Sequence, residues 1–312
     1  MNDRDPYTSM NDFQKALVDG TEGVYVVDAG PGTGKTFTLS RRYAELVKDL
    51  RVSPEDVLMV TFTNNAAAEM DDRIRRMLTE AFDRGELSKR VQARTFDSFC
   101  LSIVKESADS LGSIFGVPGL RFSRDIGTVT NDTLIGKHFE SFLDGFIESE
   151  CIARNRYHDL AIIAREGPGD LLNVINRMMT YGIIPQPDGG WFGFDHESAM
   201  RGRLTLDDLL NVKPSTIIKK LNGIYADDRF EFPDFDDSGL SVEDLESVLD
   251  DPGRDELISF VHDVYLGYIT SSIRDNRLTF ALTAVLAFTA LRNNESLRRR
   301  HMYRYVMVDE FQ

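Results

Sequence analysis

Residues 29–36 read AGPGTGKT, and they follow a short apolar, β-branched run, GVYVVDA, at 23–29. Such a run is typical of a buried parallel strand, and from Gly34 to about residue 50 the pattern becomes helical. A glycine-rich turn between a strand and a helix lets backbone N–H groups surround a phosphate, and the helix N-terminus directs its positive end at the same anion. The stretch predicts a nucleotide phosphate-binding loop, although Ala29 stands where the general pattern has glycine.

Side chains of this loop carry the rest of the phosphate chemistry. Lys35 is expected to bridge the β- and γ-phosphates, and the Thr36 hydroxyl to ligate Mg²⁺. The backbone cradle consists of Ala29, Gly30, Pro31, Gly32, Thr33 and Gly34. The sequence thus predicts a nucleoside triphosphate and Mg²⁺ as cofactors.

The far end of the chain, YVMVDEFQ at 305–312, is an apolar strand that ends in two adjacent carboxylates. In open α/β sheets, ligands bind at the carboxyl ends of the strands. We expect Asp309 to hold Mg²⁺ and Glu310 to orient and deprotonate the attacking water. Together with Lys35, these residues predict ATP hydrolysis, in which Lys35 and Glu310 are catalytic.

Strands and helices alternate near the N-terminus. Two further buried strands are predicted at 57–62 and 91–96, followed by helices at 64–82, capped by Asn64, and at 97–111, capped by Asp97. This alternation, together with the final strand, indicates a parallel sheet flanked by helices.

The pattern changes between about 113 and 275, where no strands alternate with helices. Helices are predicted there at 131–150, 156–165, 169–180, 205–222, 241–250 and 254–274, and an apolar one follows at 277–292. The acidic segment 226–256 is interpreted as a solvated face or loop. The middle of the chain is therefore a mostly helical insertion in a nucleotide-binding domain.

Composition narrows the class of protein. The net charge is −15, and nine lysines stand against 27 arginines and 51 acidic residues, which fits either adaptation to a salty cytoplasm or an acidic mesophilic protein. Such a charge opposes loose nucleic-acid binding through bulk positive potential. Cys100 and Cys151 lack metal-site spacing and are expected to be buried free thiols. With no signal peptide and no apolar run near the roughly 20 residues that span a bilayer, we expect a cytoplasmic protein without membrane contact.

Four segments resemble motifs I, Ia, Ib and II of UvrD/Rep-type superfamily 1 helicases. They are AGPGTGKTFTLSRR, VLMVTFTNNAAAEMDDRI, ARTFDSFCLSIV and YVMVDEFQ, in the family's order. The resemblance covers 1–112 and 277–312, and it implies a RecA-like P-loop NTPase domain with a large, mostly helical inserted subdomain at 113–276. A second RecA-like domain, with motifs III to VI and their arginine fingers, is not present in these 312 residues.

The resemblance also implies roles for individual residues. Gln14 corresponds to the glutamine that reads the adenine edge, and Arg42 to an arginine near the nucleotide. The implied single-stranded DNA contacts are Phe62, Thr63 and Asn64 of motif Ia and Thr95, Phe96 and Ser98 of motif Ib; Arg94 is a further phosphate-contact candidate. An aromatic face can stack a base, and a helix N-terminus can hold a phosphate.

Three departures from the family pattern remove positive charge or change a motif. Asp97 stands where motif Ib usually has histidine, Asn65 replaces the lysine common in motif Ia, and Ala281 replaces the second acidic residue of a D-F-x-D-L stretch. These departures leave the expected ATP site intact and weaken the expected DNA site.

The resemblance implies the N-terminal part of an ATP-dependent DNA helicase that translocates 3′→5′ on single-stranded DNA and acts at single-strand/duplex junctions. Without arginine fingers, which contribute about 10³–10⁵ in rate, the fragment is expected to hydrolyse ATP slowly and to unwind no duplex alone. Two alternatives stay open: a RecB- or AddA-type helicase–nuclease subunit, favoured by the Phe99-Cys100 pair, and a stand-alone nucleotide- and DNA-binding module. The insertion is expected to contact DNA or a repair or recombination protein.

Overall fold

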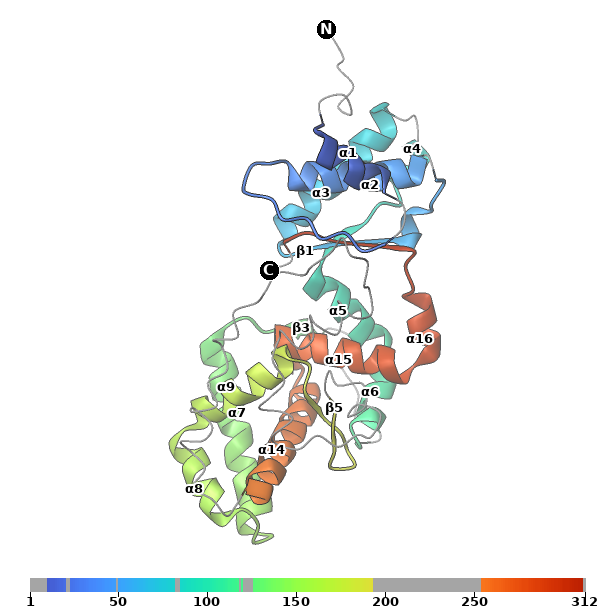
Figure 1. Cartoon of the computed structure of the whole chain (residues 1–312). Coiled ribbons are helices and arrows are strands. Elements are labelled where there is room, and N and C mark those ends of the chain that lie inside the picture. The colour runs from blue at the N-terminus through green and yellow to red at the C-terminus, as the bar shows by residue number, and fades with distance from the viewer. Residues whose placement is uncertain are drawn as a thin grey trace. The chain divides into compact units, whose positions relative to one another are not determined.

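The computed structural model describes residues 10–20, 23–48, 50–81, 85–117, 119, 126–192 and 254–310. Its described residues fall into two compact units (Figure 1). The first takes in the described parts of Met1–Phe99 and Arg298–Gln312, and the second those of Cys100–Leu297. The predicted helices 205–222 and 241–250 lie outside the described residues, as does nearly all of the acidic segment 226–256.

A three-stranded parallel sheet organises the first unit. Its strands are β1 (Val57–Thr61), β2 (Ala93–Thr95) and β7 (Tyr305–Val308), in the order β2-β1-β7. Met59 of β1 pairs with both Ala93 and Met307, so the chain's two distant parts share one register. This confirms three of the predicted strands and their parallel arrangement.

The predicted strand at 23–29 is wrong for the described chain: residues 23–30 form no ladder with any described strand. Val24, Tyr25, Val26 and Val27 are 37–48% exposed. A parallel strand is stabilised by a ladder to its neighbours and by cover on both faces, and these side chains are too exposed to be covered on both faces. Its apolar composition alone therefore did not determine its conformation.

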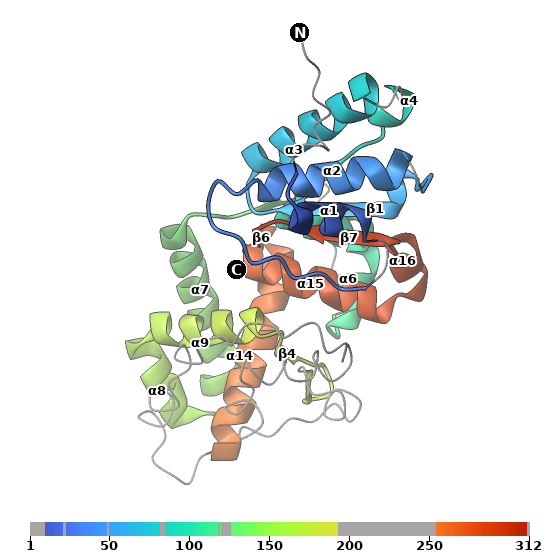
Figure 2. The ribbon, with the colours of Figure 1, turned by 45° about the horizontal axis from the view of Figure 1, so that its top comes forward.

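Several helices accompany this sheet in the first unit. They are α1 (Asp12–Asp19), α2 (Lys35–Lys48), α3 (Asn64–Arg76) and the short α4 (Gly85–Ser88), with a 3-10 turn at Pro54–Asp56 and a π-helical turn at Met77–Ala81. In both views of the ribbon, α2 and α3 lie on the same side of β1 (Figure 2). This gives the layered α/β arrangement expected from the alternating pattern.

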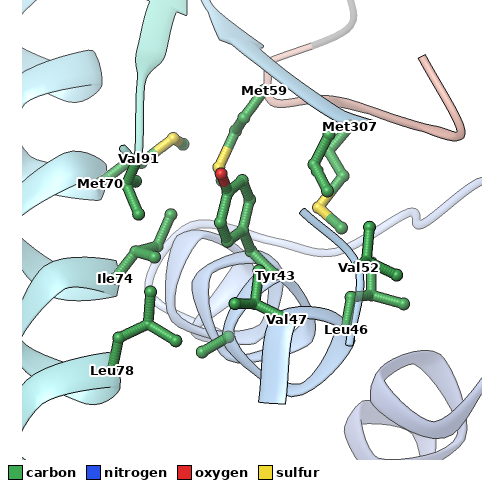
Figure 3. Packing of buried hydrophobic residues seen from close by; sticks show 12 residues of the cluster. Tyr43, Leu46, Val47, Val52, Met59, Met70, Ile74, Leu78, Val91 and Met307 are labelled. Carbon is green, nitrogen blue, oxygen red and sulfur yellow. The ribbon is translucent and has the colours of Figure 1, made fainter. Parts of the chain in front are cut away.

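A single apolar cluster fills the space between α2, α3 and the sheet (Figure 3). Tyr43 of α2 is fully buried and points toward Met59 of β1, and Ile74 of α3 lies beside them, also fully buried. Met307 of β7 joins the same cluster. Residues from both ends of the chain therefore build one core.

Two predicted helix caps are off by one or two residues. Thr63, with extended backbone, caps α3 by accepting a hydrogen bond from the Ala66 N–H at 3.1 Å, so Asn64 is the first helical residue. Thr95 accepts from the Ser98 N–H at 3.1 Å, so Asp97 lies inside the first turn of α5 (Phe96–Glu106). In each case a threonine takes the capping position, because its side-chain oxygen accepts an N–H of the first helical turn.

The second unit is mainly helical. It contains most of α5, then α6 (Ala108–Ile114), α7 (Asp132–Phe146), a π-helical turn (Ile147–Ile152), α8 (His158–Glu166), α9 (Pro168–Thr180), α14 (Arg254–Arg274) and α15 (Phe280–Asn293). Two short ladders join β3 (Gly127–Thr128) to β6 (Arg277–Leu278) and β4 (Ile184–Pro185) to β5 (Trp191–Phe192). The short helix α16 (Glu295–Arg300) leads to β7. The described helices of this part agree with the predicted ones, except that 97–111 is broken at Ser107 and 277–278 forms a strand.

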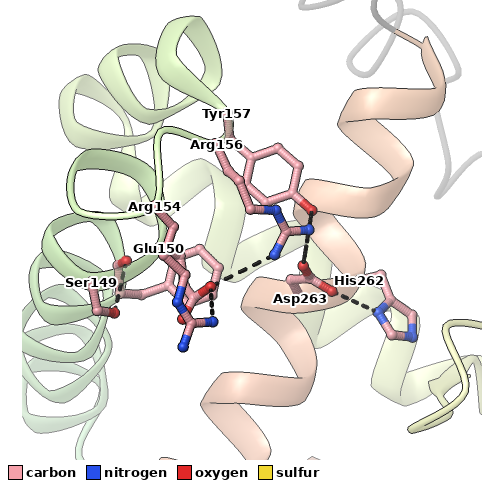
Figure 4. A network of polar contacts seen from close by, with 8 residues as sticks. Ser149, Glu150, Arg154, Arg156, Tyr157, His262 and Asp263 are labelled. Carbon is pink, nitrogen blue, oxygen red and sulfur yellow. Dashed lines mark hydrogen bonds and ion pairs between the residues drawn. The ribbon is translucent and has the colours of Figure 1, made fainter.

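A polar network links the α7–α8 connection to α14 (Figure 4). The Asp263 carboxylate accepts hydrogen bonds from the Tyr157 hydroxyl at 2.8 Å and from Arg156 at 2.9 Å. His262 lies 3.2 Å from the same carboxylate and 3.0 Å from the Gln186 carbonyl oxygen. These contacts hold the β4 region and the α7–α8 turn against one helix.

Both cysteines are buried free thiols, as predicted. Within the described ranges, no helix has the length and hydropathy needed to cross a bilayer.

Candidate nucleotide-binding and nucleic-acid-binding sites

The glycine-rich turn connects the exposed run 23–29 to α2. Gly32 and Gly34 have φ values of +76° and +87°, which L side chains rarely adopt, so both positions require glycine. The Thr33 hydroxyl donates to the Gly30 carbonyl at 2.8 Å and closes the turn. A helix of 14 residues then begins at Lys35, so its free N–H groups lie next to the turn. Such an arrangement can bind an anion.

Lys35 lies at the mouth of this turn. Its ammonium group donates a hydrogen bond to the Ala29 carbonyl at 2.6 Å, across the turn that it follows. The side chain is partly buried, so the lysine is held beside the glycine-rich backbone. A phosphate group in the turn would meet both this charge and the backbone N–H groups.

Thr36 and Asp309, 273 residues apart, meet beside the turn. The Thr36 hydroxyl donates to the Asp309 carboxylate at 3.3 Å, and the Asp309 N–H donates to the Val60 carbonyl at 2.9 Å, just past the end of the β1–β7 ladder. These are hard oxygen donors of the kind that Mg²⁺ prefers. The structure therefore brings together the two residues that were predicted to ligate the metal.

Electrostatics at this strand end favour a cation. Burial, with only 7% of the residue exposed, raises the pKa of Asp309, and the adjacent Glu310 charge raises this pKa further. The Thr36 hydrogen bond and the Lys35 charge oppose that shift. Glu310 itself is exposed and has φ = 57°, in the left-handed region. A bound divalent cation would relieve the repulsion between these two carboxylates.

Gln14 and Arg42 join α1 to the turn and to α2. The Gln14 amide nitrogen donates to the Thr33 carbonyl at 3.1 Å. Arg42 donates to the Leu17 carbonyl, and its guanidinium lies 4.9 Å from the centre of the Tyr25 ring. Burial lowers the pKa of Arg42, and the Tyr25 and Tyr305 rings oppose this. Gln14 thus lies at the phosphate turn, whereas the Arg42 head group is engaged by α1 and Tyr25.

The predicted DNA contacts gather at the carboxyl ends of β1 and β2. Thr61 and Thr95 are register partners, so the residues that follow them leave the sheet side by side. Phe62 is 76% exposed and Phe96 is 53% exposed, although both are large and apolar. Two exposed rings next to two helix N-termini form a surface suited to stacking bases and holding phosphates.

Four of the five remaining predicted contacts are engaged in local hydrogen bonds. Thr63 and Thr95 accept the capping bonds described above, and the Ser98 hydroxyl donates to the Thr95 carbonyl at 2.9 Å. Arg94 donates to the Gln92 side chain. Asn64 is exposed in the first turn of α3. Burial raises the pKa of Asp97, which lies in the first turn of α5 and adds a negative charge to this surface when ionised.

Sequence reasoning missed Asn11, which contacts the predicted site residue Gln14. It caps α1 and forms a reciprocal capping box with Gln14. The signal was available, because Asn followed three residues later by Gln is a known helix-start pattern.

Comparison with known proteins identifies the family to which the chain belongs. The model of the UvrD/REP helicase N-terminal domain matches residues 10–312. Three similar curated proteins are each an ATP-dependent DNA helicase PcrA: one from Staphylococcus aureus (39% identical over 103 residues), one from Leuconostoc citreum (38% over 103) and one from Staphylococcus epidermidis (38% over 104). Each alignment covers 33% of this chain and 13% of the relative.

The matching region of those relatives is thus a small part of their length, whereas the family model covers almost all of this chain. The order of its motifs, the parallel sheet and the meeting of Thr36 with Asp309 agree with that match. The chain belongs to the UvrD/REP helicase N-terminal domain family.

Proposed function

We propose that the chain binds and hydrolyses ATP with Mg²⁺ as part of an ATP-dependent DNA helicase that moves 3′→5′ on single-stranded DNA. The observation that carries this proposal is the contact between Thr36 and Asp309 beside the glycine-rich turn. It joins the phosphate-binding end of α2 to an acidic strand end, as metal-dependent nucleotide hydrolysis requires. The names of the curated relatives support the same activity.

The fold proposed for this activity is a RecA-like domain made of 1–112 and 277–312, interrupted by a helical subdomain at 113–276. Two features support it: the parallel sheet built from both ends of the chain, and the separate, mainly helical second unit. The boundaries of the inserted subdomain stay a prediction.

The residues present fit ATP and Mg²⁺. The two positive-φ glycines open a cradle that side chains would fill, and the oxygen donors of Thr36 and Asp309 suit a hard cation. Magnesium, when bound, neutralises charge on the phosphate oxygens. Lys35 would exchange its bond to Ala29 for the phosphates, and the exposed Glu310 would orient and deprotonate water.

A nucleotide-binding titration tests the proposal. In the 312-residue chain, Lys35→Ala is expected to abolish Mg²⁺-dependent binding of a fluorescent ATP analogue, because it removes the cation beside the turn. Lys48→Ala, at the other end of the same helix, is the matched control and should leave the affinity unchanged. An unchanged ATP affinity in the Lys35→Ala variant would contradict the assignment of residues 29–36 as a phosphate-binding loop.

For DNA, we propose that a single strand lies across the carboxyl edge of the sheet, over Phe62 and Phe96. Base stacking on an aromatic side chain is worth about 1–3 kcal/mol per base, so Phe62→Ala should weaken the binding of a labelled oligo-dT about fivefold or more. Phe13→Ala is the matched control, because Phe13 is an 88% exposed phenylalanine on α1 that is not among the predicted DNA contacts. Equal effects of the two substitutions would contradict this path.

Hydrolysis by the isolated chain should be slow, because arginine fingers belong to motifs that the 312 residues do not contain. Strand separation by the purified chain would overturn this expectation. The Phe99-Cys100 pair gives no support to a helicase–nuclease subunit, since Phe99 packs against His301 and Tyr303 and Cys100 is a buried thiol. Whether the insertion binds a repair or recombination protein, or DNA at a junction, stays a prediction.

A further inference from the structure

The side-chain amide of Gln14 is engaged at both of its ends. Its oxygen accepts a hydrogen bond from the Asn11 N–H at 3.0 Å, and its nitrogen donates to the Thr33 carbonyl at 3.1 Å. The Asn11 side chain in turn accepts from the Gln14 N–H at 2.9 Å. The capping box of α1 therefore fixes which end of the amide faces the glycine-rich turn.

That contact determines the orientation of one peptide group in the turn. The described chain has no cis peptide bonds, so the Thr33 carbonyl and the Gly34 N–H point in opposite directions. Because Gln14 holds the carbonyl toward α1, the Gly34 N–H faces away from α1. A Cβ atom on Gly34 would lie only 3.3 Å from the Gln14 nitrogen, so the two groups are in close contact.

We propose that Gln14, held by Asn11, is a positioning residue of the phosphate turn. It fixes the Thr33–Gly34 peptide so that the Gly34 N–H is ready to donate to a bound phosphate. This role is separate from reading the adenine, because it acts through the turn and applies to any polyphosphate. The inference rests on the proposed nucleotide binding.

The two roles differ in what they recognise. Replacing a residue that only reads adenine weakens the binding of ATP and does not change the affinity for GTP or inorganic tripolyphosphate. A residue that orients a backbone donor affects all three by a similar factor. One hydrogen bond corresponds to about a two- to tenfold change in affinity.

Calorimetric titration of the 312-residue chain with Mg²⁺ and each of ATP, GTP and tripolyphosphate tests the proposal. Gln14→Ala should weaken the binding of tripolyphosphate and of GTP by about two- to tenfold, and the binding of ATP by at least as much. Asn11→Ala should act in the same direction, and Asn11→Asp, which keeps the capping oxygen, should restore binding. Phe13→Ala, on the same helix, should change none of the three affinities.

Unchanged tripolyphosphate affinity in a folded Gln14→Ala variant, with ATP alone weakened, would overturn the positioning role and leave nucleotide binding standing. Failure of the unsubstituted chain to bind any of the three ligands would instead refute the proposed function itself. Circular dichroism of each variant shows whether the fold is retained, and Gln14 is only partly buried, so its replacement creates no core cavity.

Discussion

Thr95 is the last residue of β2, Thr63 lies two residues past the end of the neighbouring β1, and their hydroxyls cap α5 and α3. The family resemblance implies that the same residues contact DNA. We predict that their contribution to stability can be measured without DNA. Replacing either by alanine leaves one N–H of a first helical turn without its partner, which costs about 1 kcal/mol, within a range of about 0.5–2 kcal/mol.

Urea unfolding gives the measurement. For a domain of ordinary size, the free energy of unfolding falls by about 1–3 kcal/mol per molar urea. A loss of about 1 kcal/mol therefore lowers the midpoint for the first unit by about 0.3–1 M. The double variant measures whether the two costs add.

Thr→Ser at each position is the matched control, because serine keeps the capping oxygen and loses only a methyl group. The serine variants should therefore regain most of the urea midpoint that the alanine variants lose. If the hydroxyls act only as caps, the DNA affinity should change in step with stability across the series. An alanine variant with an unchanged midpoint would refute the capping argument. A serine variant that fails to recover would point instead to the methyl group.

Three further predictions concern side chains that are buried or partly buried. Burial and the Glu310 charge raise the pKa of Asp309, so the protonated carboxyl stabilises the fold below the ordinary aspartate pKa, and this stabilisation is lost as pH rises through the raised value. Asp309→Asn should therefore raise the melting temperature near neutral pH and remove the Mg²⁺ dependence of ATP binding. A lower melting temperature would contradict this. Burial raises the pKa of Asp263, but the hydrogen bonds from His262 and Tyr157 and the Arg156 charge outweigh burial, so the net pKa shift is downward. The ionised carboxylate therefore stabilises the fold at neutral pH, and this stabilisation is lost as pH falls below about 4. Asp263→Asn should cost about 1–3 kcal/mol at neutral pH and should reduce the loss of stability below a pH of about 4 in a pH series of denaturation curves. Ile74→Ala, in the core of the first unit, should cost about 2–5 kcal/mol against about 0.5–1.5 for Ile74→Val, and equal costs in urea titrations would show that the site collapses around the smaller side chain.

Local pattern predicted much of the sheet because β1 and β7 are short apolar runs bounded by polar residues. The same reasoning failed at 23–29, which has a similar composition and forms no ladder with any strand that the structure describes. A strand requires a neighbour, and composition does not report whether one is available. The paired and unpaired runs therefore differ in their surroundings, not in their side chains.

The caps show a limit at finer scale. The sequence TFTNN offers both Thr63 and Asn64 as good capping residues, and only the backbone decides between them. Thr63 has φ −118° and ψ 150°, which is extended, so the helix begins after it. That one-residue difference changes a proposed DNA contact, because the Thr63 oxygen is already accepting the Ala66 N–H.

The nucleotide site combines predictable and unpredictable parts for a similar reason. The rule that ligands bind at the carboxyl ends of parallel strands was enough to expect Thr36 and Asp309 together, 273 residues apart. The rule does not predict which contacts the side chains at this edge make. The Lys35 ammonium donates to the Ala29 carbonyl, and the buried Asp309 carboxylate lies beside the Glu310 charge. Both contacts depend on the folded backbone of the turn and of the strand end, which the motif letters alone do not give.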